Sequence, residues 1–293
     1  MILSKRRLYN NAFCYLFILP TLSGFILFTI YPLICSFIYS FHDYTFKEYT
    51  FIGLENYIDL INNPIFIKSF LVAFYFVIGC TPATIILTII LSALIVKMGQ
   101  RAKTLFMAIF YLPNITSIVT ITLVWRWIYD YNYGLANKIL NNFGYESINW
   151  LSNKFTVLPS LFIFGVSMSL GMPIILCVAA MLSIPKDYYE AARIDGASNW
   201  QALWYMTIPL IRPTILFLTI TTVIGNFQVF MLIVLMTGGG PYYRTTSIAF
   251  LIAREAFDFY RFGSASAMGV ILLFVISFFT ILQYKFFSKD IQY

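Results

Sequence analysis

The sequence predicts an all-α integral membrane protein with six transmembrane helices, and three observations predict this fold class. The chain of 293 residues is 60% hydrophobic and 11% charged, whereas a soluble domain is roughly 45–50% apolar and about 25% charged. Its apolar residues are gathered into long runs, and its basic residues stand in short clusters between those runs. A soluble globular protein, a disordered chain and a disulfide scaffold are therefore excluded.

Six apolar runs are long enough to cross about 30 Å of hydrocarbon. In lipid each run is expected to form a helix, because every backbone amide needs a partner within its own segment. Pro20 and Pro32 predict a kink in the first run. The predicted spans are residues 13–38, 69–96, 105–129, 157–183, 213–236 and 264–287, within a single transmembrane domain formed by residues 1–293.

The positions of lysine and arginine predict the orientation of the chain. If the N-terminus is cytoplasmic, together with Lys5, Arg6 and Arg7, the inner segments hold more basic residues than the outer segments. This is the distribution that the positive-inside rule describes, so both termini are expected to be cytoplasmic. Arg126 follows Trp125 at the outer end of the third span and is expected to extend its side chain to the interface, with a ligand contact at the outer mouth as the alternative.

The residue types exclude several classes of function. A single histidine, His42, cannot build a histidine metal cluster or a catalytic triad. The cysteines lie within apolar runs without CxxC spacing and are expected to be buried hydrophobic side chains. None of the six spans contains aspartate or glutamate, which disfavours a proton-driven transporter. No catalytic residue, metal site or bound cofactor is therefore expected, and the net charge of +7 indicates orientation in the membrane rather than a nucleic-acid partner.

The most polar inner segment, residues 184–212, predicts two short helices joined by a turn. Ser183 is expected to cap the first helix, with Pro185 in its first turn. Gly196, directly after Asp195, is expected to end that helix because glycine adopts the positive φ that a helix terminus often needs.

The second short helix is expected to begin at Ser198. Gln201 follows three residues later, and this spacing is that of a capping box. Pro209 and Pro213 are expected to end the second helix and to start the fifth span.

The same segment resembles the EAA loop of ABC importer permeases. Glu190-Ala191-Ala192 is followed after three residues by Gly196, and after nine more by Met206-Thr-Ile-Pro209. Further segments resemble the carbohydrate-uptake branch of that family, among them Trp125-Arg-Trp127 and Thr237-Gly-Gly-Gly-Pro241. The resemblance implies a type I ABC importer permease fold, with residues 184–212 as the cytoplasmic coupling loop.

In that family the EAA loop docks into a groove of a separate ATPase, and the resemblance implies the same role here. Small side chains and Gly196 would let another backbone approach closely, and polar side chains would make contacts at the rim. The residues implied are Glu190, Ala191, Ala192, Arg193, Asp195, Gly196 and Pro209. Because this chain has no GxxxxGK[ST] phosphate loop, ATP and Mg²⁺ are expected on partner ATPase subunits, and this chain is not expected to be an enzyme.

The resemblance to maltose-type permeases also nominates a substrate pocket in the spans on either side of the coupling loop. Its residues would be Ser167, Leu170, Gly171, Ile174, Asn226 and Val229. Asn226 could bind a sugar hydroxyl or a neighbouring helix, and Gly171 could admit a sugar ring or permit close helix packing. Ile174 and Val229 depart from the larger side chains of maltose-type pockets, which disfavours maltose itself.

The function that this resemblance implies is one half of a transmembrane path for a carbohydrate, of oligosaccharide size. The implied partners are a second homologous permease subunit, two ATPase subunits, an extracytoplasmic sugar-binding protein and membrane lipid. The alternative is a non-transporting membrane scaffold or regulatory protein that retains the permease fold.

Overall fold

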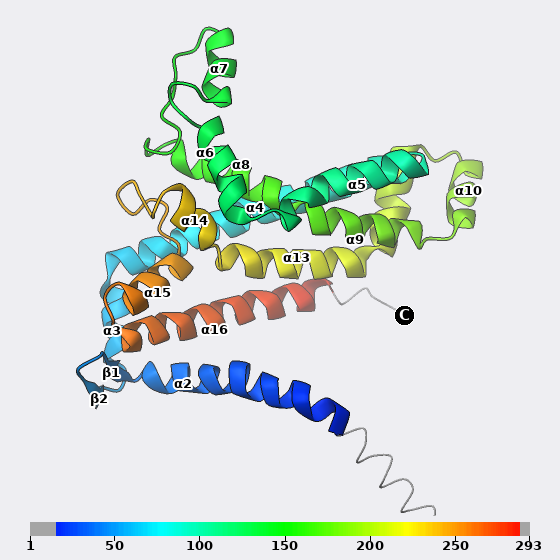
Figure 1. Cartoon of the computed structure of the whole chain (residues 1–293). Coiled ribbons are helices and arrows are strands. Elements are labelled where there is room, and N and C mark those ends of the chain that lie inside the picture. Colours follow the sequence, from blue (N-terminus) through cyan, green and yellow to red (C-terminus); the bar gives the residue numbers. More distant parts are fainter. Residues whose placement is uncertain (1–15, 288–293) are drawn as a thin grey trace, which may run out of the picture. The chain divides into compact units, whose positions relative to one another are not determined.

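A computed structural model describes residues 16–287 of the chain (Figure 1). Lys5, Arg6 and Arg7, on which the predicted orientation depends, and residues 13–15 of the first predicted span lie outside this range. The described part is helical apart from one two-stranded hairpin and the connecting loops. The fold class is therefore the all-α one that the composition predicts.

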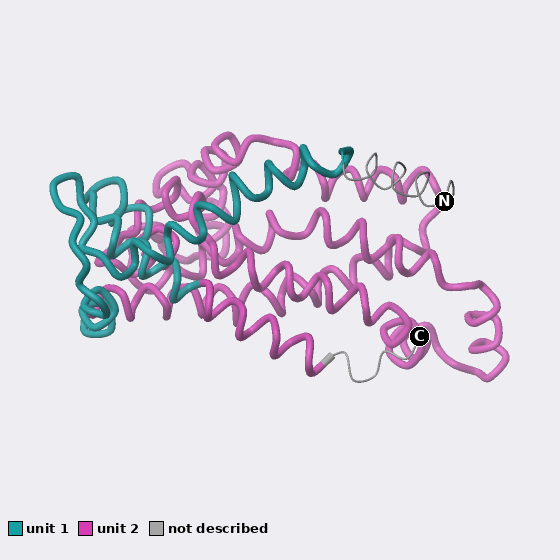
Figure 2. Tube along the Cα trace, turned by 90° about the horizontal axis from the view of Figure 1, so that it is seen from below, with its two compact units in different colours: residues 1–62, 252–272 teal, residues 63–251, 273–293 magenta. Residues whose placement is uncertain are grey.

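The chain divides into two compact units, coloured separately in Figure 2. Unit 1 comprises the residues up to 62 and residues 252–272, and unit 2 comprises residues 63–251 and those from 273 onward. The helices α15 (Ile248–Phe257) and α16 (Phe262–Phe287) contribute residues to both.

Unit 1 begins with a helical run, Leu16–Tyr39, that is long and apolar enough to cross a membrane. Where a kink is predicted at Pro32, the run contains a π-helical turn, because proline has no N–H to continue the α-helical pattern. The elements of this unit after residue 25 are η1 (Ile26–Ile30), α2 (Tyr31–Tyr39), β1 (His42–Tyr44), β2 (Tyr49–Phe51) and α3 (Glu55–Asn62).

The hairpin of unit 1 is antiparallel, with His42 opposite Phe51. Asn56 fastens it to the helix before it, because its Nδ2 donates to the carbonyls of Ser40 and His42 at 3.0 Å. Gly263 at the start of α16 lies so close to the His42 carbonyl that no Cβ fits there. These contacts fix the loop after the first helical run.

Unit 2 is organised around α4 (Pro64–Val96), which Asn63 caps by accepting from the Ile65 amide at 2.9 Å. The helix α4 packs against α9 and α13, and α9 packs against α5. The remaining helices of the unit before residue 184 are α5 (Gln100–Ile115), α6 (Ile118–Ile128), α7 (Leu135–Asn142), α8 (Val157–Ser169) and α9 (Gly171–Leu182).

Two predicted spans are bent pairs rather than straight helices. The span predicted at 105–129 consists of α5 and α6, which meet at 101°, and the span at 157–183 consists of α8 and α9, which meet at 45°. Thr116 has extended backbone, and Ser117 is also non-helical, between α5 and α6. Hydropathy reports only that both halves are apolar, and it carries no information about the direction of the backbone.

The fifth predicted span, 213–236, is also interrupted. The helix α13 (Arg212–Phe227) ends at Gln228, and α14 (Met231–Met236) begins three residues after the polar Gln228. The hydroxyl of Ser247 donates to the Val229 carbonyl at 2.5 Å and so satisfies a backbone group that the break exposes. The sixth predicted span, 264–287, falls within the continuous helix α16.

A glycine fixes the packing of α9 on α5. A Cβ at Gly171 would lie 2.6 Å from the Phe110 carbonyl oxygen and 2.8 Å from Asn114 Oδ1. Contacts this short require a backbone to move. Of the two interpretations of Gly171, the structure therefore supports close helix packing.

We expect Gly171→Ala to lower the free energy of unfolding by roughly 1–3 kcal/mol, the usual cost of overpacking. The measurement is thermal unfolding of the purified chain in a fixed detergent. Gly269→Ala is the matched control, because nothing lies within 4 Å of a Cβ at that helical glycine. An unchanged melting temperature for Gly171→Ala would contradict the close packing.

Candidate functional site

The polar segment 184–212 forms two helical pieces, as predicted. The first is α10 (Lys186–Ile194), and the second is a continuous run made of α11 (Asn199–Ala202), η2 (Leu203–Thr207) and α12 (Ile208–Leu210). In Figure 1, α10 lies beyond the ends of α9 and α13. We call residues 184–212 the polar element.

The turn between the two pieces is the one that the sequence predicts. Gly196 has φ +78°, its N–H donates to the Arg193 carbonyl at 3.0 Å, and the Ala197 N–H donates to the Ala192 carbonyl at 2.9 Å. This pair of bonds is a complete Schellman motif. Residues 192–197 therefore close α10 firmly, and the left-handed glycine is essential to that closure.

The predicted capping box at Ser198 is confirmed, and the predicted helix cap at Ser183 is wrong. Ser198 Oγ accepts from the Gln201 amide at 3.3 Å, and Gln201 Oε1 accepts from the Ser198 amide at 2.8 Å. Ser183 instead ends α9 and donates its hydroxyl to the Ala180 carbonyl, because Ile184 and Pro185 separate it from the first turn of α10.

A tyrosine joins the two pieces of the polar element. Tyr189 of α10 and Thr207 of η2 are linked by a hydroxyl–hydroxyl bond of 3.2 Å, and Thr207 is buried. The helix α12, which contains Pro209, ends at Leu210. At the next residue, Ile211, the chain turns by 74° into α13. The two pieces are thus tied to each other and continuous with α13.

The residues predicted to dock a partner lie on the outside of the polar element. Glu190, Ala191, Arg193, Asp195, Gly196 and Pro209 are exposed, and Ala192 is half-buried. A Cβ at Gly196 would meet no atom of this chain within 4 Å. Ile194 and Tyr205 are 86% and 84% exposed, and solvent exposure of such large apolar side chains is typical of a surface that another molecule covers.

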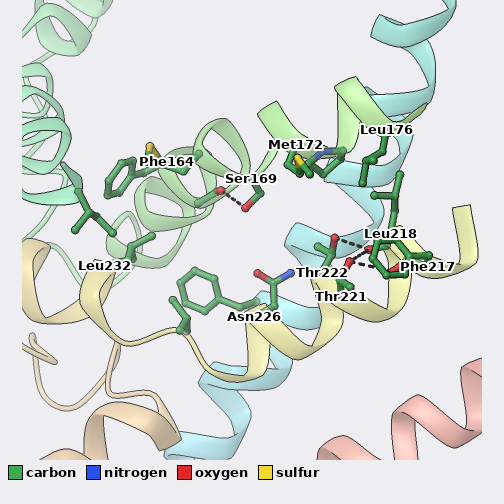
Figure 3. Close-up of a pocket in the computed structure, with 17 residues that line it drawn as sticks. Phe164, Ser169, Met172, Leu176, Phe217, Leu218, Thr221, Thr222, Asn226 and Leu232 are labelled. Atoms are coloured by element: carbon green, nitrogen blue, oxygen red, sulfur yellow. Dashed lines mark hydrogen bonds between the residues drawn. The ribbon is translucent and has the colours of Figure 1, made fainter. Parts of the chain in front are cut away.

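A cavity of about 620 Å³ lies in unit 2, between α8 and α9 on one side and α13 on the other (Figure 3). Its apolar wall includes Phe164, Met172 and Leu232. Its polar atoms come from Ser169, Thr221, Thr222 and Asn226. The volume is in the range of pockets that hold small molecules.

The hydroxyl groups that line this cavity already donate hydrogen bonds to backbone carbonyls of their own helices. Ser169 donates to the Gly165 carbonyl at 2.7 Å, Thr221 to Phe217 at 2.9 Å and Thr222 to Leu218 at 2.7 Å. Their oxygen lone pairs can still accept hydrogen bonds. The cavity therefore offers acceptors to a ligand that carries O–H donors.

Among the described residues, none that lines this cavity is charged. An ionic ligand would lose its hydration here without gaining a counter-charge, which is costly in an apolar environment. The arrangement therefore suits a neutral ligand with several hydroxyl groups.

Two of the six pocket residues nominated from the sequence line this cavity, and four do not. Asn226 and Val229 belong to the lining. Leu170 and Ile174 are buried in an apolar cluster with Ile95, Gly171 packs on α5, and Ser167 donates to the Phe164 carbonyl.

The difference is one of helical register. Successive residues of a helix are rotated by about 100°, so the lining side chains Met168, Ser169 and Met172 precede or follow the nominated ones by one or two positions. On α13 a signal in the sequence was available. Thr221, Thr222 and Asn226 are polar residues within an apolar span, and the spacing of four between Thr222 and Asn226 places those two on one face.

Asn226 binds a neighbouring helix. Its Nδ2 donates to Thr81 Oγ1 of α4 at 2.9 Å, and Figure 3 shows the amide extending from α13 toward the cavity below Ser169 and Met172. One of its two N–H donors is therefore committed to the α4–α13 contact, while the side chain as a whole still lines the cavity.

No metal site accompanies these features in the described part of the chain. Among residues 16–287, no three side chains of His, Cys, Asp or Glu come close enough to hold a metal ion.

The known proteins that this chain resembles are membrane transport components. Residues 85–293 match a family described as binding-protein-dependent transport system inner membrane component. The trehalose/maltose transport system permease protein MalF of Thermococcus litoralis is 32% identical over 290 residues, 96% of each chain. The osmoprotective compounds uptake permease protein GgtC of Synechocystis is 32% identical over 236 residues, 78% of this chain and 83% of that protein.

A solved structure shares the fold. A bacterial ABC transporter involved in the import of the acidic polysaccharide alginate contains a chain that superposes with a TM-score of 0.87. The sequences are 23% identical, and the match covers 98% of this chain and 99% of that one.

We expect Ser198→Ala to speed amide hydrogen exchange in residues 199–203 and to cost roughly 1 kcal/mol, since it removes an N-cap. Ser183→Ala is the control. It also removes a serine hydroxyl, but that hydroxyl does not cap the N-terminus of a helix. Exchange is measured on both variants of the full chain by mass spectrometry. Equal exchange in residues 199–203 of the two variants would contradict the role of the capping box.

Proposed function

This chain belongs to the family of inner membrane components of binding-protein-dependent transport systems, and we propose that it forms one half of the path of an ABC importer for a neutral carbohydrate. The observation that carries the proposal is the uncharged cavity between α8–α9 and α13, whose hydroxyl oxygens are free to accept. The relative named for trehalose and maltose transport supports a sugar of oligosaccharide size.

The side chains of this chain favour a neutral sugar as the transported substrate. The transporter with the shared fold imports an acidic polysaccharide, but at 23% identity only its fold carries over. A carboxylated sugar would need a cation, and none lines the cavity described here. A neutral sugar presents O–H donors to Ser169, Thr221 and Thr222 and apolar C–H faces to Phe164 and the methionine side chains.

The energy for transport comes, in this proposal, from two separate ATPase subunits that hold ATP and Mg²⁺. Family members are transport components rather than enzymes, and this chain has no phosphate loop. The polar element would dock on an ATPase through its exposed tip, which includes Ile194, Gly196 and Tyr205. Closure of the two ATPases on ATP would then move the docked helices as rigid bodies.

The assembly would contain further partners. A second homologous permease would supply the other half of the path, and an extracytoplasmic binding protein would deliver the sugar. The polar element and both chain termini would then lie on the cytoplasmic side. Asn226 and Val229 would contact the sugar together with the hydroxyls of α8 and α13.

We expect the double variant Thr221→Val/Thr222→Val to raise the sugar concentration for half-maximal uptake by roughly 2- to 10-fold for each acceptor that binds sugar. Valine keeps the shape and removes the oxygen. Thr219→Val is the matched control, because Thr219 makes the same bond within α13, to Ile215 at 2.7 Å, but does not line the cavity. Equal KM values for both variants would contradict this site.

We expect Gly196→Leu to leave the protein in the membrane but to uncouple uptake from ATP hydrolysis, because leucine strains the left-handed position and fills the space that a partner would occupy. Gly144→Leu is the matched control, since Gly144 also has a positive φ of +81° with open space at its Cβ. Both variants are assayed in proteoliposomes with the partner subunits. Full uptake by Gly196→Leu would overturn the coupling role.

The same proteoliposomes separate a transporter from a non-transporting scaffold. A sugar that the binding protein retains should stimulate ATP hydrolysis only when this chain is present. Its failure with every retained sugar would favour the scaffold.

A further inference from the structure

A second cavity, of about 380 Å³, lies where the end of α4 meets the polar element. It is separate from the sugar cavity described above and shares no lining residue with it. Residues of α4, α9, α10, α11 and η2 contribute to its wall. All of them belong to unit 2.

The wall of this cavity is apolar inside and basic at the edge. Ile90, Leu94 and Leu203 provide apolar surface, and Lys97 and Arg193 are exposed residues that also line it. Within residues 16–287, no acidic residue belongs to the lining. Within the described residues neither cation makes an ion pair, so the two positive charges are available to a ligand.

The remaining polar side chains of the wall, which include Asn199, Tyr189 and Thr207, are uncharged. The hydroxyls of Tyr189 and Thr207 are bonded to each other at 3.2 Å. A ligand is therefore met by apolar side chains, two cations and the uncharged amide of Asn199, a pattern that an amphiphilic anion matches.

The position of the cavity indicates that the amphiphilic anion is a membrane lipid. Leu94 is 53% exposed and Ile90 is 38% exposed on a helix long and apolar enough to cross a membrane, so this side of α4 faces hydrocarbon. Trp200, 59% exposed, also lines the cavity, and tryptophan is enriched where the membrane meets water. The cavity thus lies at the level of lipid headgroups.

We propose that this cavity binds one anionic phospholipid, with its phosphate at Lys97 and Arg193 and an acyl chain along Ile90 and Leu94. Basic pockets between transmembrane helices are known to hold anionic headgroups. The site needs only a membrane-embedded chain and does not depend on the transported substrate. Because one cation, Lys97, directly follows α4 and the other, Arg193, belongs to α10, the lipid would connect the end of the span to the polar element.

The test is lipid retention by the purified full chain, measured by native mass spectrometry after titration with phosphatidylglycerol or phosphatidylcholine. We expect preferential retention of phosphatidylglycerol, and roughly 30-fold weaker retention by Lys97→Gln/Arg193→Gln, since each basic residue near the headgroups contributes about fivefold. Lys97→Arg/Arg193→Lys should retain the lipid. Gel filtration and thermal unfolding confirm that each variant is folded.

The matched control is Arg101→Gln/Lys186→Gln, which removes the same charge from exposed residues near this end of unit 2 that do not line the cavity. Its retention should equal that of the natural chain. Equal loss in both double variants would overturn the site in favour of a diffuse surface charge. Equal retention of phosphatidylcholine, or displacement by inorganic phosphate, would overturn the assignment to an anionic lipid.

Discussion

In lipid, a backbone must satisfy its own hydrogen bonds, and the helices of this chain obey that constraint while bending several times. Side-chain hydroxyls accompany the irregular points. Ser169 bonds the Gly165 carbonyl where α8 turns into α9, Thr207 bonds the Ala202 carbonyl within the π-helical turn, and Ser247 bonds the Val229 carbonyl between α13 and α14. Each hydroxyl thus pairs with a backbone carbonyl at an irregular point, so that the hydroxyl itself is not left unpaired in an apolar environment.

Features encoded by a few adjacent residues were predictable from the sequence. The left-handed Gly196 and the capping box of Ser198 need only their neighbours, and both have the predicted form. The failed cap at Ser183 shows the limit of this reasoning, since a hydroxyl at the end of one helix bonds backward when the next helix begins three residues later. Composition likewise determined the fold class but not the bends, which depend on how α5, α6 and α13 pack.

The cavity was harder to predict than the polar element. A register change of one or two residues along α8 and α9 separates the cavity side chains from Leu170 and Ile174, which face Ile95 instead. Only tertiary packing distinguishes these faces, because each carries a serine, Ser167 or Ser169, among mainly apolar side chains. The polar residues of α13 were the more informative signal: the tie between Asn226 and Thr81 fixes the rotation of the helix and with it the direction of Thr222.

The acceptor character of the hydroxyl oxygens in the cavity wall also bears on how long a ligand stays. In an empty path, water molecules donate to the same oxygens of Ser169, Thr221 and Thr222. A sugar hydroxyl that replaces water exchanges one O–H···O bond for another, so each exchange changes the free energy little. Such a wall recognises hydroxyl groups by their geometry without holding them tightly, and this property favours passage of the ligand over storage.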